Sequence, residues 1–408
     1  MIPPPFPTAA PFRVDQVMVA PLAMTGLFVA QALLALLIHV AGAQQRWRVW
    51  RSGVIGLLLV VLVFFTLASW GNSDPTRFSH FMEWDPAKAP PEPLWRLLRP
   101  LLLLLPYRMA AVQGLVATGY AGAVVLLAVS WRARAWAGWW SLLILSSPML
   151  RGFLQNAHTR QALAVLLLLP LFLHTAQLVK LERRWLGLGV VLSALTHSTF
   201  VLNLPISLLP ALLRLPQAVP TLLQRPGRMH GRDWMRHWPW LLLAAGALAL
   251  FLMLAPMALD RFLDYSQDSY FNNYPVRRIV GRLQRALAFG LILGCLQARL
   301  RPLQLLRCRL SQLLLLFGLL YIGIQTSINM LWLPQITCRL ADGVAFFMLI
   351  LYLAWLHHYR AYWCVLPALY VTFQYWLEGR LLVSASLDCG RNDEFLCIPD
   401  RWPWQVRY

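Results

Sequence analysis

Apolar runs of about 20 residues recur along most of this chain, from residue 17 to residue 376. A helix needs about 20 apolar residues to cross the hydrocarbon core of a bilayer. A single segment inside the bilayer satisfies its own backbone hydrogen bonds only as a helix. Charged residues are 13% of the chain, whereas an ordinary soluble domain has about 25%. We therefore predict an all-α fold, a polytopic bundle of membrane helices, and exclude a water-soluble globular protein.

The runs predict about 12 transmembrane helices, or between about 10 and 12, and leave no separate soluble domain in residues 1–408. The two runs around His197 are short for two crossings, so they indicate either two short tilted helices or one long broken helix. The predicted spans are residues 17–41, 52–70, 108–130, 137–150, 160–179, 185–200, 201–213, 238–257, 282–298, 311–331, 339–356 and 361–377.

Basic residues give the predicted orientation. All 36 of them except Lys88 and Lys180 are arginines, and the formal charge is +20. Such a charge first suggests nucleic acid. We exclude that partner because the arginines lie in short loops between spans, where the positive-inside rule and the lipid bilayer explain them. The predicted inner loops, with the basic loop 214–237 among them, hold only the acids Glu182 and Asp233, so both termini are predicted to lie outside.

Two cysteines fit the same orientation. Cys389 and Cys397 share the polar tail, residues 378–408, which is predicted to be exported. In an oxidising compartment they could close a small disulfide. The alternative is two unpaired thiols, and zinc would need more ligands than the tail offers.

The first outer loop, residues 71–107, carries two candidate catalytic carboxylates. Asp74 and Glu92 lie near arginines at the membrane surface, where a carboxylate can act as general base on a sugar hydroxyl. Residues 94–105 are too short to cross, which indicates a re-entrant or interfacial helix. The alternative for the loop is a solvated connection rich in turn residues.

Arg160 and Gln161 lie directly before an apolar run and are expected in the first turn of its helix. A guanidinium beside the unpaired N–H groups of a helix start suits an anionic oxygen such as that of phosphate. They are therefore candidate substrate-binding residues. The alternative is an arginine that extends to the lipid headgroups.

His197 stands in the polar break Thr196-His197-Ser198-Thr199 between two apolar runs. A neutral imidazole there can take a proton or donate to a phosphate oxygen, so it is a third catalytic candidate. The alternative is a packed, hydrogen-bonded histidine.

The outer loop at residues 258–285 combines tyrosines, amides and arginines. Aromatic rings suit the apolar faces of a sugar, and arginines at helical spacing could share one face and bind a diphosphate. Ordinary headgroup binding is the alternative. The candidate substrate-binding residues here are Tyr270, Tyr274, Arg278, Arg282 and Arg285.

Four short segments follow one another in a suggestive order: Gly71-Asn-Ser-Asp74 with Phe78 and Phe81, Glu92-Pro93-Leu94-Trp95, Arg160-Gln161-Ala162, and Thr196-His197-Ser198. In this order they resemble the EpsG-like family of Wzy-type polysaccharide polymerases. The resemblance covers about residues 70–210, with similar hydropathy beyond.

The resemblance implies a bacterial inner-membrane enzyme that joins oligosaccharide repeat units carried on undecaprenyl diphosphate at the periplasmic face. The products would be exopolysaccharide, capsule or O-antigen, and a flippase and a chain-length regulator of the pathway would be partners. The chemistry asks for cations on the departing diphosphate, here Arg160 and the Arg278 set, and for a base, here Asp74, Glu92 or His197. Neither a metal nor another cofactor is expected.

Two other classes remain open. A glycosyltransferase that uses a polyprenyl-phosphate sugar would also place an acid in an early outer loop, though more often after the first span. A transporter of lipid-linked saccharide would need polar residues deep in several spans, and most spans here are apolar at their centres.

Overall fold

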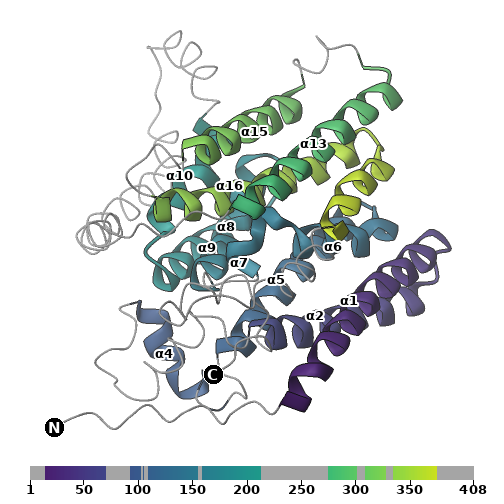
Figure 1. The fold of residues 1–408 in the computed structure, drawn as a ribbon. Helices are drawn as coiled ribbons and strands as arrows, with labels where there is room; N and C mark the ends of the chain where they lie inside the picture. The colour runs from purple at the N-terminus through teal and green to yellow at the C-terminus, as the bar shows by residue number, and fades with distance from the viewer. Residues whose placement is uncertain are drawn as a thin grey trace, which may run out of the picture.

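The computed structural model describes residues 14–69, 92–102, 104, 109–154, 159–212, 274–300, 308–327 and 334–374, and every regular element in these ranges is helical (Figure 1). The first helices are α1 (Val14–Ala43), α2 (Trp47–Ser69), α4 (Pro93–Leu102), α5 (Met109–Ser130), η2 (Arg134–Trp136), α6 (Ala137–Ser146), η3 (Pro148–Leu150) and α7 (Arg151–Leu154). They are followed by α8 (Thr159–Thr175), α9 (Arg183–Thr196), α10 (Phe200–Leu212), α13 (Tyr274–Gln297), α15 (Arg309–Ser327), α16 (Pro334–His358) and η4 (Tyr362–Val365).

Four of the described helices are long and apolar enough to cross a membrane, which supports a membrane protein. The all-helical prediction is confirmed for the described residues, whereas the count of about 12 spans stays a prediction. The four segments are Thr25–Ala43, Trp47–Thr66, Ala111–Ser130 and Arg339–His358, and shorter apolar helices cover Thr159–Thr175, Phe200–Ala211 and Arg309–Ile324.

Two helices begin well before the predicted positions. Helix α2 begins at Trp47, several residues before the predicted span, and α13 begins at Tyr274, so residues 274–285 of the predicted outer loop are helical. Both early starts carry arginines, which extend a helix beyond its apolar run because long cationic side chains reach the interface. The runs around His197 form two separate helices, α9 and α10.

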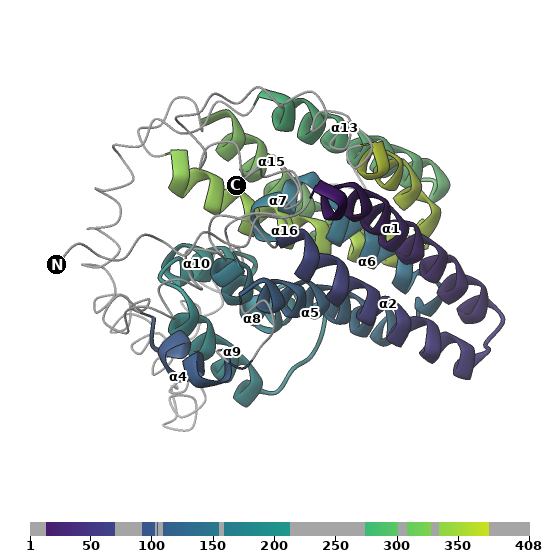
Figure 2. The same cartoon turned by 60° about the horizontal axis from the view of Figure 1, so that its bottom comes forward.

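Helix α16 is the centre of the bundle. Its membrane-length segment is 83% buried, whereas that of α1 is 22% buried, although both are apolar. It packs against α8, α10 and α15, while α1, α2, α5 and α6 pack among themselves along one side (Figures 1 and 2). The same apolar composition therefore serves the interior in α16 and faces outward in α1.

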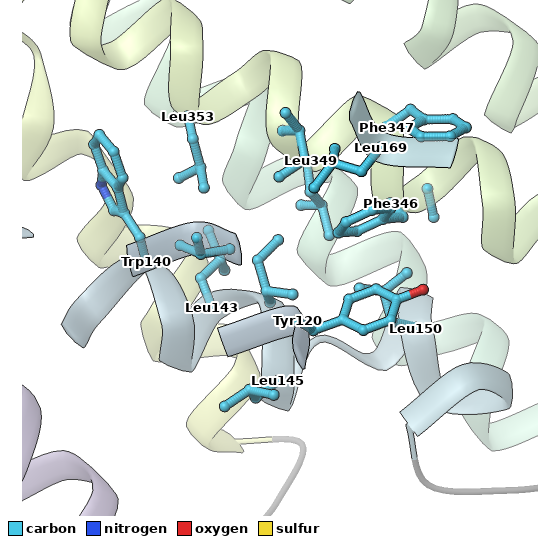
Figure 3. Close-up of a cluster of buried hydrophobic side chains, with 14 of the residues drawn as sticks. Tyr120, Trp140, Leu143, Leu145, Leu150, Leu169, Phe346, Phe347, Leu349 and Leu353 are labelled. Atoms are coloured by element: carbon cyan, nitrogen blue, oxygen red, sulfur yellow. The ribbon is translucent and has the colours of Figure 1, made fainter. Parts of the chain in front are cut away.

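The buried core joins α5, α6, α8 and α16. Figure 3 shows Tyr120 of α5 beside Phe346 of α16, with ring centroids 4.5 Å apart. Phe347 stacks on Phe172 of α8 at 4.3 Å. Trp140 of α6 is fully buried in the same cluster. Helix α8 contacts α16 in this core, while it packs most extensively against α9 and α10.

Five helices end in the same backbone conformation. The second residue after each helix has a positive φ, and two backbone hydrogen bonds close the last turn, as in a Schellman motif. None of these residues is glycine: they are Gln45, Arg132, Gln177, Arg299 and Arg360. They follow α1, α5, α8, α13 and α16, all of which are predicted to end on the inner side.

The bundle has two distinct ends. The turn between α1 and α2 packs against η2, and Trp131 stacks on His357 at 5.6 Å, so these helix ends lie together. We call this the Arg134 end, and the opposite end, where α4 lies, the Glu92 end. Both views place the α1–α2 turn at the right and α4 at the left (Figures 1 and 2).

Candidate functional site

An ion pair between Glu92 and Arg160 joins two segments that lie 68 residues apart. Glu92 immediately precedes α4, and Arg160 is in the first turn of α8. Arg160 Nη1 donates to Glu92 Oε2 at 3.1 Å and to Oε1 at 3.3 Å. The side chains of Arg160 and Glu92 are 16% and 5% exposed. Burying a carboxylate this far is unfavourable unless a cation compensates it, so the pair fixes both residues together.

Trp95 fastens α4 to the break that holds His197. Its indole N–H donates to the backbone carbonyl of Thr196 at 2.8 Å, and the indole is buried. Thr196 is the last residue of α9. Helix α4 is therefore held at two points, by Glu92 on α8 and by Trp95 on α9.

His197 is buried at the break between α9 and α10. The backbone N–H of Thr199 donates to its Nδ1 at 3.0 Å, and the Thr199 hydroxyl is 2.9 Å from the same nitrogen. Because Nδ1 accepts an N–H, the neutral ring carries its proton on Nε2. Of the two roles predicted for His197, this tautomer favours donation to a ligand oxygen.

Buried polar contacts hold the first turn of α8. The Thr159 hydroxyl donates to Gln113 Oε1, and Gln113 Nε2 donates to the Phe153 carbonyl at 2.7 Å. The Tyr120 hydroxyl donates to the Ala162 carbonyl at 2.9 Å. Helix α5 thus supports the first turn of α8. The Arg160 guanidinium therefore extends from a fixed backbone.

Gln161 connects this turn to α16. Its Nε2 donates to the Arg339 carbonyl at 2.7 Å, across 178 residues of sequence. Its Oε1 is buried and accepts no hydrogen bond from the described residues. Arg339 and Asp342, three residues apart at the start of α16, interact electrostatically, and Tyr120 lies near Asp342. The start of α16 is therefore part of the same cluster.

Asn203 of α10 lies against Gly343 of α16. A methyl group at Gly343 would overlap Asn203 Oδ1, so only glycine permits this approach. Asn203 is fully buried, its Nδ2 donates to the Thr199 carbonyl at 3.0 Å, and its Oδ1 accepts no hydrogen bond within the described part of the chain. Gln161 and Asn203 thus present two buried amide oxygens near residues 339–343 of α16.

The other predicted site residues do not join this cluster or lie outside the described residues. Arg282 and Arg285 are exposed on α13, which contacts η3 and η4, and Figure 2 shows α13 at the opposite edge from α4. The backbones of Tyr274 and Arg278 are also in α13. Asp74 and Tyr270 lie outside the described residues.

The structure adds residues that the sequence interpretation missed or treated only as supporting features. Gln113, Asn203 and Gly343 lie in apolar runs, and Trp95 was named only as part of the segment that resembles the polymerase family. A polar amide within an apolar span was the available signal for Gln113 and Asn203, because such residues are costly unless they are bonded. No comparable signal marks Gly343.

The described residues form an all-helical fold with helices able to cross a membrane. The guanidinium of the polar cluster suits an anion, and its amide oxygens suit hydroxyl groups such as those of a sugar. The cluster contains one guanidinium, one imidazole and two buried amide oxygens. Compared with known proteins, the chain matches no family model, no curated protein and no solved structure.

Proposed function

We propose that this chain is an inner-membrane polymerase that joins undecaprenyl-diphosphate-linked oligosaccharide repeat units. The observation that carries the proposal is the meeting of three of the four segments that resemble Wzy-type polymerases. Glu92 contacts Arg160, and Trp95 contacts Thr196. Contacts among all three segments through buried polar side chains favour one shared site over three unrelated loops.

In the proposed reaction, a hydroxyl of one lipid-linked unit attacks the reducing-end sugar of the growing chain. The new glycosidic bond forms as the bond from that sugar to its lipid diphosphate breaks, and the hydroxyl proton passes to a base. Arg160 binds the departing diphosphate, because a guanidinium at a helix start matches phosphate oxygens. His197 adds an N–H donor from Nε2.

Glu92 acts as a positioning residue in this proposal, since both of its oxygens already bond the Arg160 guanidinium. Asp74 is then the candidate base. Glu92→Gln keeps an acceptor for Arg160 and should retain much of the activity, whereas Asp74→Asn should abolish it. The reverse result would make Glu92 the base.

The orientation follows from the inner-loop arginines, with the Glu92 end at the periplasmic face. Reporter fusions after Arg184 and Arg309 should report cytoplasm, and one after Asp400 should report the exported side. A cytoplasmic tail would overturn this orientation.

Analysis of lipid-linked oligosaccharide in cells that lack the chain tests the proposal. We expect complete single repeat units, accessible from outside, and no long polymer. A repeat that lacks one sugar would instead indicate a glycosyltransferase, and complete repeats confined to the inner leaflet would indicate a transporter. Either of these results would overturn the polymerase proposal.

A further inference from the structure

At the Arg134 end, the α1–α2 turn and the η2 segment are joined into one unit. The Trp50 indole N–H donates to the Arg134 carbonyl at 3.0 Å, and His39 Nδ1 lies 3.0 Å from the Ala135 carbonyl. A Cβ on Gly42 would lie 2.8 Å from Ala135 Cα, so the two backbones touch. These contacts hold the segments without using the charged group of any arginine.

An arginine is stacked on this unit. The Arg134 guanidinium lies 4.7 Å from the centroid of the Trp47 ring, and Trp47 stacks on Trp50 at 4.9 Å with an angle of 7° between the rings. Trp50 is buried, while Trp47 and Arg134 are exposed. A guanidinium stacked by its face keeps the N–H groups of its edge available for a planar bidentate contact with phosphate.

Arg134 lies among other arginines, and no acidic residue is close to it in the sequence. No Asp or Glu occurs between residues 16 and 73 or between residues 93 and 181. All arginines of the two segments are exposed: Arg46, Arg48, Arg51, Arg132 and Arg134. Several guanidiniums without a counter-charge attract a multivalent anion.

Apolar surface continues from these arginines along the same two helices. Residues of α1 and α2 next to the turn are exposed although they are large and apolar: Leu36, Leu37, Val40, Val49, Ile55 and Leu59. Both helices are long and apolar enough to lie in a bilayer. A ligand that fits both surfaces carries phosphate at one end and acyl chains at the other.

We propose that the unit formed by the α1–α2 turn and residues 131–136 is a binding site for an anionic phospholipid with two phosphates in its headgroup. The Arg134 guanidinium, held on Trp47, binds one phosphate, and the neighbouring arginines bind the other. The acyl chains lie along α1 and α2. The inference is independent of the proposed polymerase activity.

The chain contains a matched control at Arg184. Its guanidinium also lies over a tryptophan ring, 5.5 Å from the Trp185 centroid, but Glu182 pairs with it at 2.6 Å. Both members of that pair are exposed. Arg184 therefore also lies over a tryptophan ring, but its charge is already compensated.

Native mass spectrometry of the full chain, released from detergent with added lipids, tests the site. Cardiolipin should bind at least about tenfold more tightly than phosphatidylethanolamine, which lacks net charge. Arg134→Ala should lose most of that preference, and Trp47→Ala a smaller part. Arg184→Ala should bind like the unmodified chain. Arg134→Ala keeps the Trp50 bond, because that bond uses the backbone carbonyl.

Three results would overturn the proposal. Equal cardiolipin binding by Arg134→Ala and the unmodified chain would remove Arg134 from the site. An equal loss in Arg184→Ala would show that only net charge matters. Displacement of cardiolipin by inorganic phosphate at the same concentration as the lipid would indicate a simple anion site in which the acyl chains have no role.

Discussion

Arg160 at the Glu92 end and Arg134 at the Arg134 end are held in opposite ways. Arg160 starts a helix, is mostly buried and is paired with a carboxylate. Arg134 follows the end of a helix, is exposed and stacks on a tryptophan. A buried charge requires a fixed partner, whereas an exposed charge is solvated and remains open to a ligand. Both residues are arginines, so the difference comes from their surroundings: Glu92 fixes the position of Arg160, and the Trp47 ring fixes that of Arg134.

The distance between the two charged groups does not by itself predict how much an ion pair contributes to stability or activity. Arg184 lies 2.6 Å from Glu182, closer than the 3.1 Å between Arg160 and Glu92. Yet the Arg184 pair is exposed, where water competes for both groups, and the Arg160 pair is buried. The longer contact is therefore the one expected to matter for stability and activity.

The largest effect should come from Arg160→Ala. Removing one partner of a buried pair costs about 3–5 kcal/mol, because Glu92 is left buried and uncompensated. Product formation should also fall by at least about an order of magnitude, and Arg160→Lys should recover only part of it. Unfolding in detergent measures the loss of stability, and polymer length measures the loss of product formation. Arg184→Ala is the control and should change stability by less than about 1 kcal/mol.

A double variant separates folding from chemistry at this pair. Glu92→Met combined with Arg160→Met replaces both charges with apolar side chains, which is often close to neutral in stability. We expect a folded chain that makes no polymer. Normal polymer from the double variant would reduce the pair to a structural contact.

Gly343→Ala should have the next largest effect. The added methyl group would overlap Asn203 Oδ1, and Asn203 is fully buried and bonded to Thr199, so it cannot move aside easily. Overpacking of this kind costs about 1–3 kcal/mol, measured by unfolding. Gly122→Ala is the control, since nothing lies within 4 Å of its added methyl, and it should be neutral or gain up to about 1 kcal/mol. Asn203→Ala should relieve the Gly343→Ala loss, and additive losses would contradict the overlap.

Local features of the Glu92 end could be predicted from sequence. Apolar runs gave the helices, the polar break at His197 gave the α9–α10 junction, and the short segment after Glu92 gave α4. The place of Arg160 in the first turn of α8 also followed, because it directly precedes an apolar run. Each of these depends on neighbours within a few residues, where spacing is informative.

The contacts could not be predicted in the same way. Glu92 meets Arg160, and Gln161 meets Arg339, only because α4, α8 and α16 pack in one arrangement among many. Apolar runs do not specify which helices are neighbours, since lipid and protein interior are equally apolar. The family resemblance grouped Arg278 with Arg160 as cations for the diphosphate, and helix α13, which carries Arg278, contacts η3 and η4 and lies at the opposite edge from α4 in Figure 2.

A thiol at the Arg134 end gives a pH-dependent prediction. Burial raises the pKa of Cys308, but hydrogen bonds from Tyr359 and from the N–H groups of Ser311 and Leu310 outweigh it and lower the pKa overall. Burial first, and then the bond to Cys308, raise the pKa of Tyr359 to about 12. The thiolate therefore forms at lower pH than in an ordinary cysteine, and alkylation should rise at correspondingly lower pH. A chain with Cys308 as its only cysteine, alkylated across a pH series, measures this.

Tyr359→Phe is the matched variant for that measurement. It removes one donor to the thiolate and should move the alkylation midpoint upward. A midpoint at or above that of a free thiol in the starting chain would contradict the hydrogen-bonded geometry.

The variants with the smallest expected effect separate stability from ligand binding at the Arg134 end. Gln45 and Arg132 have φ values of 56° and 57°, a conformation that costs a residue with a Cβ about 1–2 kcal/mol. Gln45→Gly should therefore gain about 1 kcal/mol in unfolding, once the greater freedom of unfolded glycine is subtracted, and Arg132→Gly should gain similarly. Gln44→Gly, one residue earlier and within the last hydrogen-bonded turn, should instead lose up to about 1 kcal/mol.

If the side chains at these caps serve lipid binding, Arg132→Gly will be more stable and yet bind cardiolipin less tightly, whereas Gln45→Gly will gain stability with little change in binding. Loss of stability in Arg132→Gly would contradict the backbone argument, and unchanged cardiolipin binding in that variant would remove Arg132 from the proposed lipid site.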